Sequence, residues 1–181
     1  MSISQKIAKF ILSLWGWKIT GNIPNTAKGV FIVAPHTHWQ DIPLGLLVRT
    51  AIDLKVCFVA KKSLFKGLSG RIFYALGGYP VDRSKNRGFV DAVVDIFNSK
   101  ESFFIAIAPE GTRKKVSEFR SGFYYIAHKA KIPMYLTKFD FENKCVDFSP
   151  PFWTTDNAEE TIATVENYFR GVKGKIVNRS F

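Results

Sequence analysis

GVFIVAPHTHWQD, residues 29–41, joins an apolar run to a cluster of polar side chains. The GVFIV run has the continuous hydrophobicity of a strand that is buried on both faces of a sheet. Pro35 ends this strand, and two histidines and an aspartate follow within residues 36–41. A rigid sheet holds the loops at its strand ends in place, so this loop is a candidate for chemistry.

Segments of the same kind recur along the chain. We expect further strands over residues 17–21, 54–61, 79–83, 102–111, 134–141 and 144–149, the last two forming a hairpin. We expect helices over residues 3–15, 43–49, 67–78, 88–98, 121–130 and 156–171. Buried strands that alternate with helices predict a single α/β domain with a largely parallel central sheet flanked by helices. Ligands of such sheets bind beyond the carboxyl ends of the strands, where Pro35 and Pro109 place His36 and Glu110 at one crevice.

Composition narrows the class of protein. A chain of 181 residues with 46% hydrophobic and 23% charged residues suits one domain with a sizeable core. The net charge of +11 predicts an anionic partner, such as an acidic lipid surface, a phosphorylated substrate or an acidic carrier protein. Nucleic acid is not expected, because no nucleic-acid module is recognisable. Cys57 and Cys145 have no metal-ligand spacing, so we expect free thiols and no metal.

The first 17 residues, MSISQKIAKFILSLWGW, have the periodicity of an amphipathic helix. We expect no cleaved leader, because the N-terminus lacks a basic leader and a small-residue cleavage site. We expect no membrane-spanning helix, because no apolar stretch reaches the length of about 20 residues that a bilayer requires. The apolar positions recur at helical spacing: Ile3, Ile7, Phe10, Ile11, Leu14 and Trp15. This face either lies in a membrane interface or docks on the core of the domain.

Three polar patches are candidates for a catalytic site. Across a strand-to-helix turn, the Asp41 carboxylate can hold one ring nitrogen of His36 as N–H and leave the other as an acceptor. The alternative is that Asp41 only caps a helix. In GGYPVDRS, residues 77–84, Arg83 offers a fork-shaped cation for a phosphate or carboxylate. In IAPEGTRKK, residues 107–115, glycine lets the backbone approach a ligand that Thr112 and Arg113 can bind.

Taken together, the patches resemble the glycerolipid acyltransferase family. HTHWQD matches its histidine–four residues–aspartate motif, GGYPVDR its glycine-rich motif and EGTR its third motif, while IPMYL, residues 132–136, matches a weaker fourth. The resemblance implies acyl transfer from acyl-coenzyme A or acyl carrier protein to a lysophospholipid, foremost 1-acyl-sn-glycerol 3-phosphate, with no cofactor. It also implies a cytoplasmic protein bound peripherally to the inner face of the membrane, with residues 1–17 as an interfacial helix and 18–181 as the acyltransferase domain.

The resemblance also assigns roles to individual residues. It makes His36 the general base and Asp41 the group that orients it, without a metal. Acceptor binding falls to the remaining motif residues: Arg83, Glu110, Gly111, Thr112 and Arg113.

Some features depart from this pattern or suggest another class. Pro35 stands where the family often has asparagine, and His38 stands where a small hydroxyl residue is common, which makes His38 a rival base. Ser63 and Lys66 fit an S-x-x-K serine hydrolase motif, but its partner motifs are missing. A non-enzymatic protein that binds membranes or nucleic acid through its charge is the other alternative.

Overall fold

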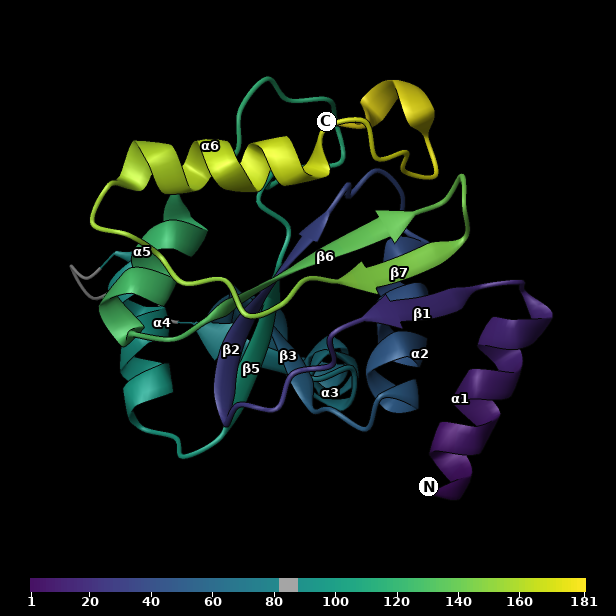
Figure 1. The fold of residues 1–181 in the computed structure, drawn as a ribbon. Helices are drawn as coiled ribbons and strands as arrows, with labels where there is room; N and C mark the ends of the chain where they lie inside the picture. The colour runs from purple at the N-terminus through teal and green to yellow at the C-terminus, as the bar shows by residue number, and fades with distance from the viewer. Residues whose placement is uncertain (82–87) are drawn as a thin grey trace.

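A seven-stranded sheet organises the computed structural model, which describes residues 1–81 and 88–181 (Figure 1). The strand order is β1-β7-β6-β2-β5-β3-β4. The strands are β1 (Lys18–Gly21), β2 (Lys28–Ala34), β3 (Val56–Lys61), β4 (Gly78–Val81), β5 (Phe103–Ile107), β6 (Met134–Asp140) and β7 (Cys145–Phe148). Neighbouring strands run parallel except in the β6–β7 hairpin. The predicted α/β class and the predicted hairpin are confirmed.

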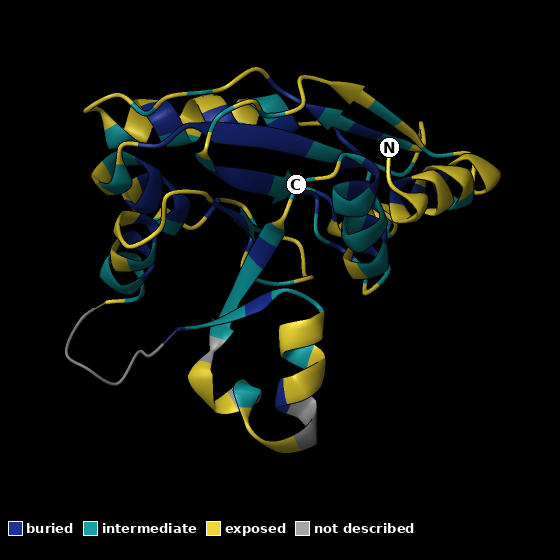
Figure 2. Cartoon of the chain, turned by 90° about the horizontal axis from the view of Figure 1, so that it is seen from below, coloured by how far each residue is buried: buried dark blue, intermediate teal, exposed yellow. Residues whose placement is uncertain are grey.

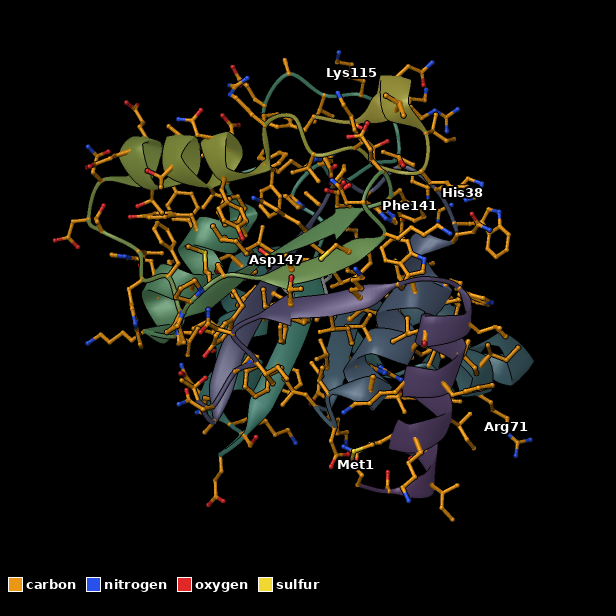
Figure 3. All side chains as sticks on the ribbon, turned by 45° about the vertical axis from the view of Figure 1, so that its right-hand side comes forward. Met1, His38, Arg71, Lys115, Phe141 and Asp147 are labelled. Carbon is orange, nitrogen blue, oxygen red and sulfur yellow. The ribbon has the colours of Figure 1, made fainter. Side chains whose placement is uncertain are left out.

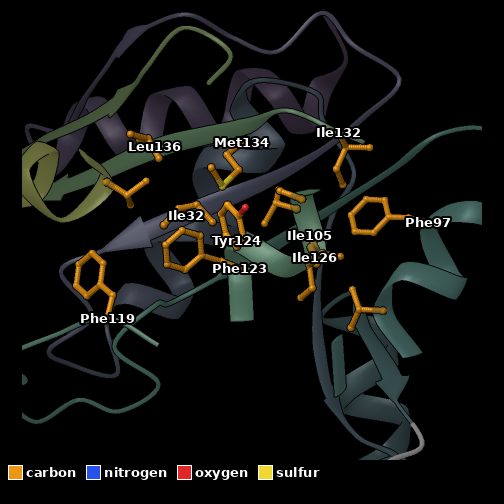
Figure 4. Close-up of a cluster of buried hydrophobic side chains, with 14 of the residues drawn as sticks. Ile32, Phe97, Ile105, Phe119, Phe123, Tyr124, Ile126, Ile132, Met134 and Leu136 are labelled. Carbon is orange, nitrogen blue, oxygen red and sulfur yellow. The ribbon is translucent and has the colours of Figure 1, made fainter. Parts of the chain in front are cut away.

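Helices cover both faces of the sheet. The helices are α1 (Ile3–Leu14), α2 (Asp41–Ala51), α3 (Gly67–Ala75), α4 (Phe89–Asn98), α5 (Gly122–Ala130) and α6 (Ala158–Phe169), with short 3-10 turns η1 (Lys62–Phe65) and η2 (Val177–Arg179). Alternate residues of β2 point to opposite faces, so Ile32 packs with α4, α5 and α6, whereas Phe31 packs with α1 and α2. Figure 4 shows the first of these two cores, which is rich in phenylalanine and isoleucine.

The edges of the sheet differ from the expectation in detail. The helix expected over residues 67–78 ends at Ala75, because Gly78 already pairs with Phe58 as the first residue of β4. Helix α2 begins at Asp41, two positions before Pro43. The η1–α3 segment projects from the β3–β4 edge rather than covering a face (Figure 2).

The apolar stripe of α1 does not dock on the core. The helix packs on α2 through the side that buries Gln5, Ala8 and Leu12. By contrast, Ile3 is 78% exposed, Phe10 68% and Leu14 72%. The alternative of a core-docking apolar face is therefore wrong. In the part of the chain that the structure describes, no helix has the length and hydrophobicity needed to cross a bilayer.

Candidate active site

His36 and Asp41 form a close imidazole–carboxylate pair at the carboxyl end of β2. The His36 Nδ1 atom lies 2.9 Å from Asp41 Oδ2, and the aspartate side chain is 3% exposed against 22% for the histidine. A carboxylate can only accept, so Nδ1 carries the proton and Nε2 presents a lone pair. This is the arrangement that a general base requires.

The Asp41 carboxylate also shapes the loop that carries the histidine. Its Oδ2 atom accepts the backbone N–H groups of Thr37 and His38, both at 3.0 Å. The N-cap residue of α2 is Gln40, and the carboxylate bonds loop N–H groups ahead of the helix. The alternative in which Asp41 only caps the helix is therefore wrong, since the side chain holds the loop and the imidazole at the same time.

His38 occupies a different environment. Its Nδ1 atom accepts the backbone N–H of Gln40 at 3.3 Å, and its ring lies beside that of Trp39, with centroids 5.5 Å apart. The side chain lies at the periphery of the molecule in Figure 3. Only the backbone of His38 bonds the Asp41 carboxylate, so the geometry favours His36 as the base.

Glu110 supports the same loop from the end of the neighbouring strand. β2 and β5 pair in parallel register, and Glu110 Oε1 accepts the backbone N–H of His36 at 2.8 Å. Burial raises the pKa of Glu110 above its ordinary value, a shift that the His36 N–H bond opposes and the Asp41 charge reinforces. The carboxyl group lies beneath the site, with 3% of the residue exposed, so its position fits loop support better than direct acceptor contact.

An open cationic pocket lies beside the His36 ring. It has a volume of about 630 Å³ and is lined by His36, Ala108, Gly111, Thr112, Arg113, Lys114 and Arg179. Arg113 Nε donates to His36 Nε2 at 3.4 Å, a long bond that occupies the Nε2 lone pair. Gly111 has φ +63°, a conformation that favours glycine, and a Cβ there would require the Arg120 side chain, whose Nε would lie 2.6 Å away, to move. The pocket offers donors and positive charge for an anionic group.

Neither the glycine-rich motif nor the apolar fourth motif contributes a described residue to the lining of this pocket. Arg83 lies outside the described residues, so its place relative to the pocket is not part of the structure. Residues 132–136 lie within or just before β6, where Met134, Tyr135 and Leu136 are buried in the two cores. This apolar motif therefore builds the sheet beside β2 rather than the pocket.

A second hollow lies between α1 and the loop that holds His38. It has a volume of about 730 Å³ and is lined by Trp15, Trp17, Trp39, Gln40, Pro43, Leu44, Phe141, Glu142, Lys144, Lys173, Gly174, Lys175 and Val177. Its lining includes four aromatic residues and three lysines. Aromatic rings beside lysines are typical of surfaces that meet the polar boundary of a membrane.

Sequence reasoning missed the residues that follow α6. Ile176 donates its backbone N–H to Thr37 Oγ1 at 3.1 Å, which ties this segment to the His36 loop. Thr37 is fully buried, and Arg179 reaches the cationic pocket. These positions lie about 140 residues from the loop they contact, and no local motif marks them.

Features of the competing chemistries lie elsewhere. Burial raises the pKa of the Cys57 thiol, which disfavours the reactive thiolate. Within residues 1–81 and 88–181, no three histidine, cysteine or acidic side chains gather as a candidate metal site. Ser63 lies in η1, on the segment that projects from the sheet, and does not line the cationic pocket.

Fold and site together define an α/β protein with an imidazole–carboxylate pair beside the cationic pocket. Residues 17–136 match the family model described as Acyltransferase, and the chain belongs to this family. A comparison with curated proteins found no match. The crystal structure of the 1-acyl-sn-glycerophosphate (LPA) acyltransferase PlsC from Thermotoga maritima is similar, with a TM-score of 0.60 and 19% identity over 97% of this chain and 75% of that one. At this identity the similarity establishes the shared fold.

Proposed function

We propose that this protein transfers a fatty acyl group from a thioester donor to the free hydroxyl of a lysophospholipid, with 1-acyl-sn-glycerol 3-phosphate as the acceptor. The donor is acyl-coenzyme A or acyl carrier protein. The observation that carries the proposal is the 2.9 Å contact between His36 Nδ1 and Asp41 Oδ2. The His36 ring also lines the cationic pocket. Membership of the acyltransferase family supports the reaction class.

In this proposal His36 acts as a general base. Its Nε2 atom takes the proton of the acceptor hydroxyl while the hydroxyl oxygen attacks the thioester carbonyl. Asp41 stabilises the imidazolium that forms. The tetrahedral intermediate then expels the donor thiolate, and Nε2 gives the proton of the acceptor hydroxyl to this thiolate. The ester bond forms as the thioester bond breaks, and no enzyme-bound acyl group is needed.

Arg113 has a second role in this scheme. Its Nε donates to His36 Nε2 at 3.4 Å, so the lone pair of the base is occupied by a group that also pairs well with a phosphate. We propose that the acceptor phosphate draws Arg113 away from the imidazole and frees Nε2 for the hydroxyl. Thr112 and the backbone around Gly111 would then bind the same phosphate and orient the acceptor.

We further propose that the exposed face of α1 binds the membrane peripherally. Lys6 and Lys9 flank the exposed apolar residues of the helix, a combination that suits an anionic interface. Trp39, which is exposed beside the His36 loop, shares the second hollow with Trp15 at the end of α1. A membrane that holds α1 would therefore lie near the site, where a lipid acceptor must enter.

A substrate panel tests the proposal. Purified protein is incubated with lysophospholipids of different head groups and with acyl-coenzyme A or acyl carrier protein donors, and products are identified by mass spectrometry. We expect phosphatidic acid from 1-acyl-sn-glycerol 3-phosphate, with lower yields from acceptors that lack a phosphate monoester. Transfer to another acceptor alone would retain the chemistry and reject the acceptor, and no transfer with any pair would reject the function.

A further inference from the structure

The segment Lys173–Phe181, which we call the strap, crosses the loop that carries His36 (Figure 1). Ile176 donates to Thr37 Oγ1 at 3.1 Å. A Cβ on Gly174 would lie 2.7 Å from two Thr37 side-chain atoms and 3.2 Å from Pro35 Cγ, so the backbone can pass this close only as glycine. The strap is thus packed directly on the first motif.

The end of the strap is fixed on both sides of Arg179. Ser180 Oγ accepts the backbone N–H of Gly174 at 2.9 Å, and the ring of Phe181 lies 4.2 Å from that of Phe119. Arg179 itself donates its backbone N–H to Ile176 at 3.0 Å. The Arg179 backbone is therefore held in place while its side chain reaches the pocket that His36 lines.

The charged side chains that line this pocket are all cationic. Arg113, Lys114 and Arg179 line it, and no acidic residue of the described chain is among its lining residues. Like charges gathered around one hollow repel each other, and an anion in the hollow relieves that repulsion. Arginine presents two parallel donors that match a phosphate.

We propose that Arg179 binds the acceptor phosphate together with Arg113 and so selects acceptors with a phosphate monoester. This inference rests on the proposed function, because it concerns the same pocket. It adds a residue outside the matched range 17–136. A monoester carries up to two negative charges, so it gains more from a further cation than a phosphodiester or an uncharged head group does.

The test uses three variants of the full chain. Arg179→Ala removes the cation, Arg179→Lys keeps the charge without the fork, and Arg71→Ala removes an exposed arginine of α3 as the matched control. Figure 3 places Arg71 well away from Lys115, which marks the loop beside the pocket. Two readouts are compared: KM for 1-acyl-sn-glycerol 3-phosphate and for a monoacylglycerol, and the calorimetric Kd of glycerol 3-phosphate.

We expect Arg179→Ala to raise the KM of the phosphate acceptor and the Kd of glycerol 3-phosphate about tenfold, as for the loss of one charge-assisted hydrogen bond. The KM of monoacylglycerol should stay within about twofold of the wild-type value. Arg179→Lys should give KM and Kd values between those of the wild type and Arg179→Ala, and Arg71→Ala should match the wild type.

Active Arg179→Ala protein with an unchanged KM for the phosphate acceptor and an unchanged Kd for glycerol 3-phosphate would overturn the inference and leave the function standing. Inactive wild type whose glycerol 3-phosphate binding still weakens in Arg179→Ala would reject the function and retain the anion site. Wild type that binds no glycerol 3-phosphate would overturn the inference.

Discussion

Replacing Asp41 with asparagine separates the charge of the carboxylate from its shape. The amide oxygen of the variant can keep the Oδ2 position and still accept from Thr37, His38 and His36 Nδ1. The amide NH2 group then takes the place of Oδ1, which is buried and has no hydrogen-bond partner among the described residues. What the variant loses is the negative charge beside the imidazole.

The size of the effect follows from that charge. Unit charges about 4 Å apart interact by about 4 kcal/mol at an effective dielectric constant of about 20. The His36 side chain keeps 22% of its surface exposed, and water weakens the interaction, so we take about 3 kcal/mol for the imidazolium of the transition state. This corresponds to a loss of about 10²-fold in the rate of acyl transfer.

The assay is single-turnover transfer to 1-acyl-sn-glycerol 3-phosphate, followed by mass spectrometry of the phosphatidic acid. Thermal unfolding controls for the fold, since Asp41→Asn should cost about 1–2 kcal/mol in the free energy of unfolding through weaker hydrogen bonds. Asp41→Ala should cost more, because it leaves the buried Thr37 N–H without an acceptor. A folded Asp41→Asn protein that keeps more than about a third of the wild-type rate would refute the charge argument.

Three further predictions concern the pocket, the loop and the membrane. Arg113→Ala should raise the KM for the phosphate acceptor about tenfold, whereas Lys115→Ala, which removes a charge from the same loop outside the pocket lining, should not. Equal effects of the two variants in steady-state kinetics would reject phosphate binding by Arg113. Because burial raises the pKa of Glu110, the folded state keeps a proton that the unfolded state releases, so stability falls as pH rises from the ordinary value of 4.5 through the raised one. Glu110→Gln should flatten this part of the Tm–pH curve. An unchanged curve would contradict the attribution of this pH dependence to Glu110. Phe10→Glu should abolish flotation with anionic liposomes while Tyr125→Glu, exposed on α5 across the sheet, should not; undiminished flotation would remove α1 as the anchor.

Local patterns were sufficient to predict the sheet and the central pair of the site. The apolar runs that became β2, β5 and β6 are continuous because parallel strands are buried on both faces, and their ends brought His36 and Glu110 together. The pairing of His36 with Asp41 could be predicted from their spacing in the sequence, because both residues belong to one strand-to-helix turn. The His36–Asp41 contact depends on a few neighbouring positions, and the His36–Glu110 contact follows from two strand ends that the sequence marks separately.

Contacts between distant segments could not be predicted in the same way. The strap reaches Thr37 through backbone groups and a glycine, none of which has a distinctive sequence signature. The outward stripe of α1 was also ambiguous, because periodicity fixes the composition of a helix face but not what covers it. The side on which Ala8 and Leu12 pack became evident only when α1 was placed against α2.

The most direct test of the proposed mechanism compares His36→Ala with His38→Ala in single-turnover acyl transfer to 1-acyl-sn-glycerol 3-phosphate. Both histidines lie in the same loop, but only the His36 ring contacts the Asp41 carboxylate, while the His38 ring accepts the Gln40 N–H. We expect His36→Ala to lose at least about 10²-fold in rate and His38→Ala to stay within about threefold of the wild type. An active His36→Ala protein beside an inactive, folded His38→Ala protein would contradict the mechanism.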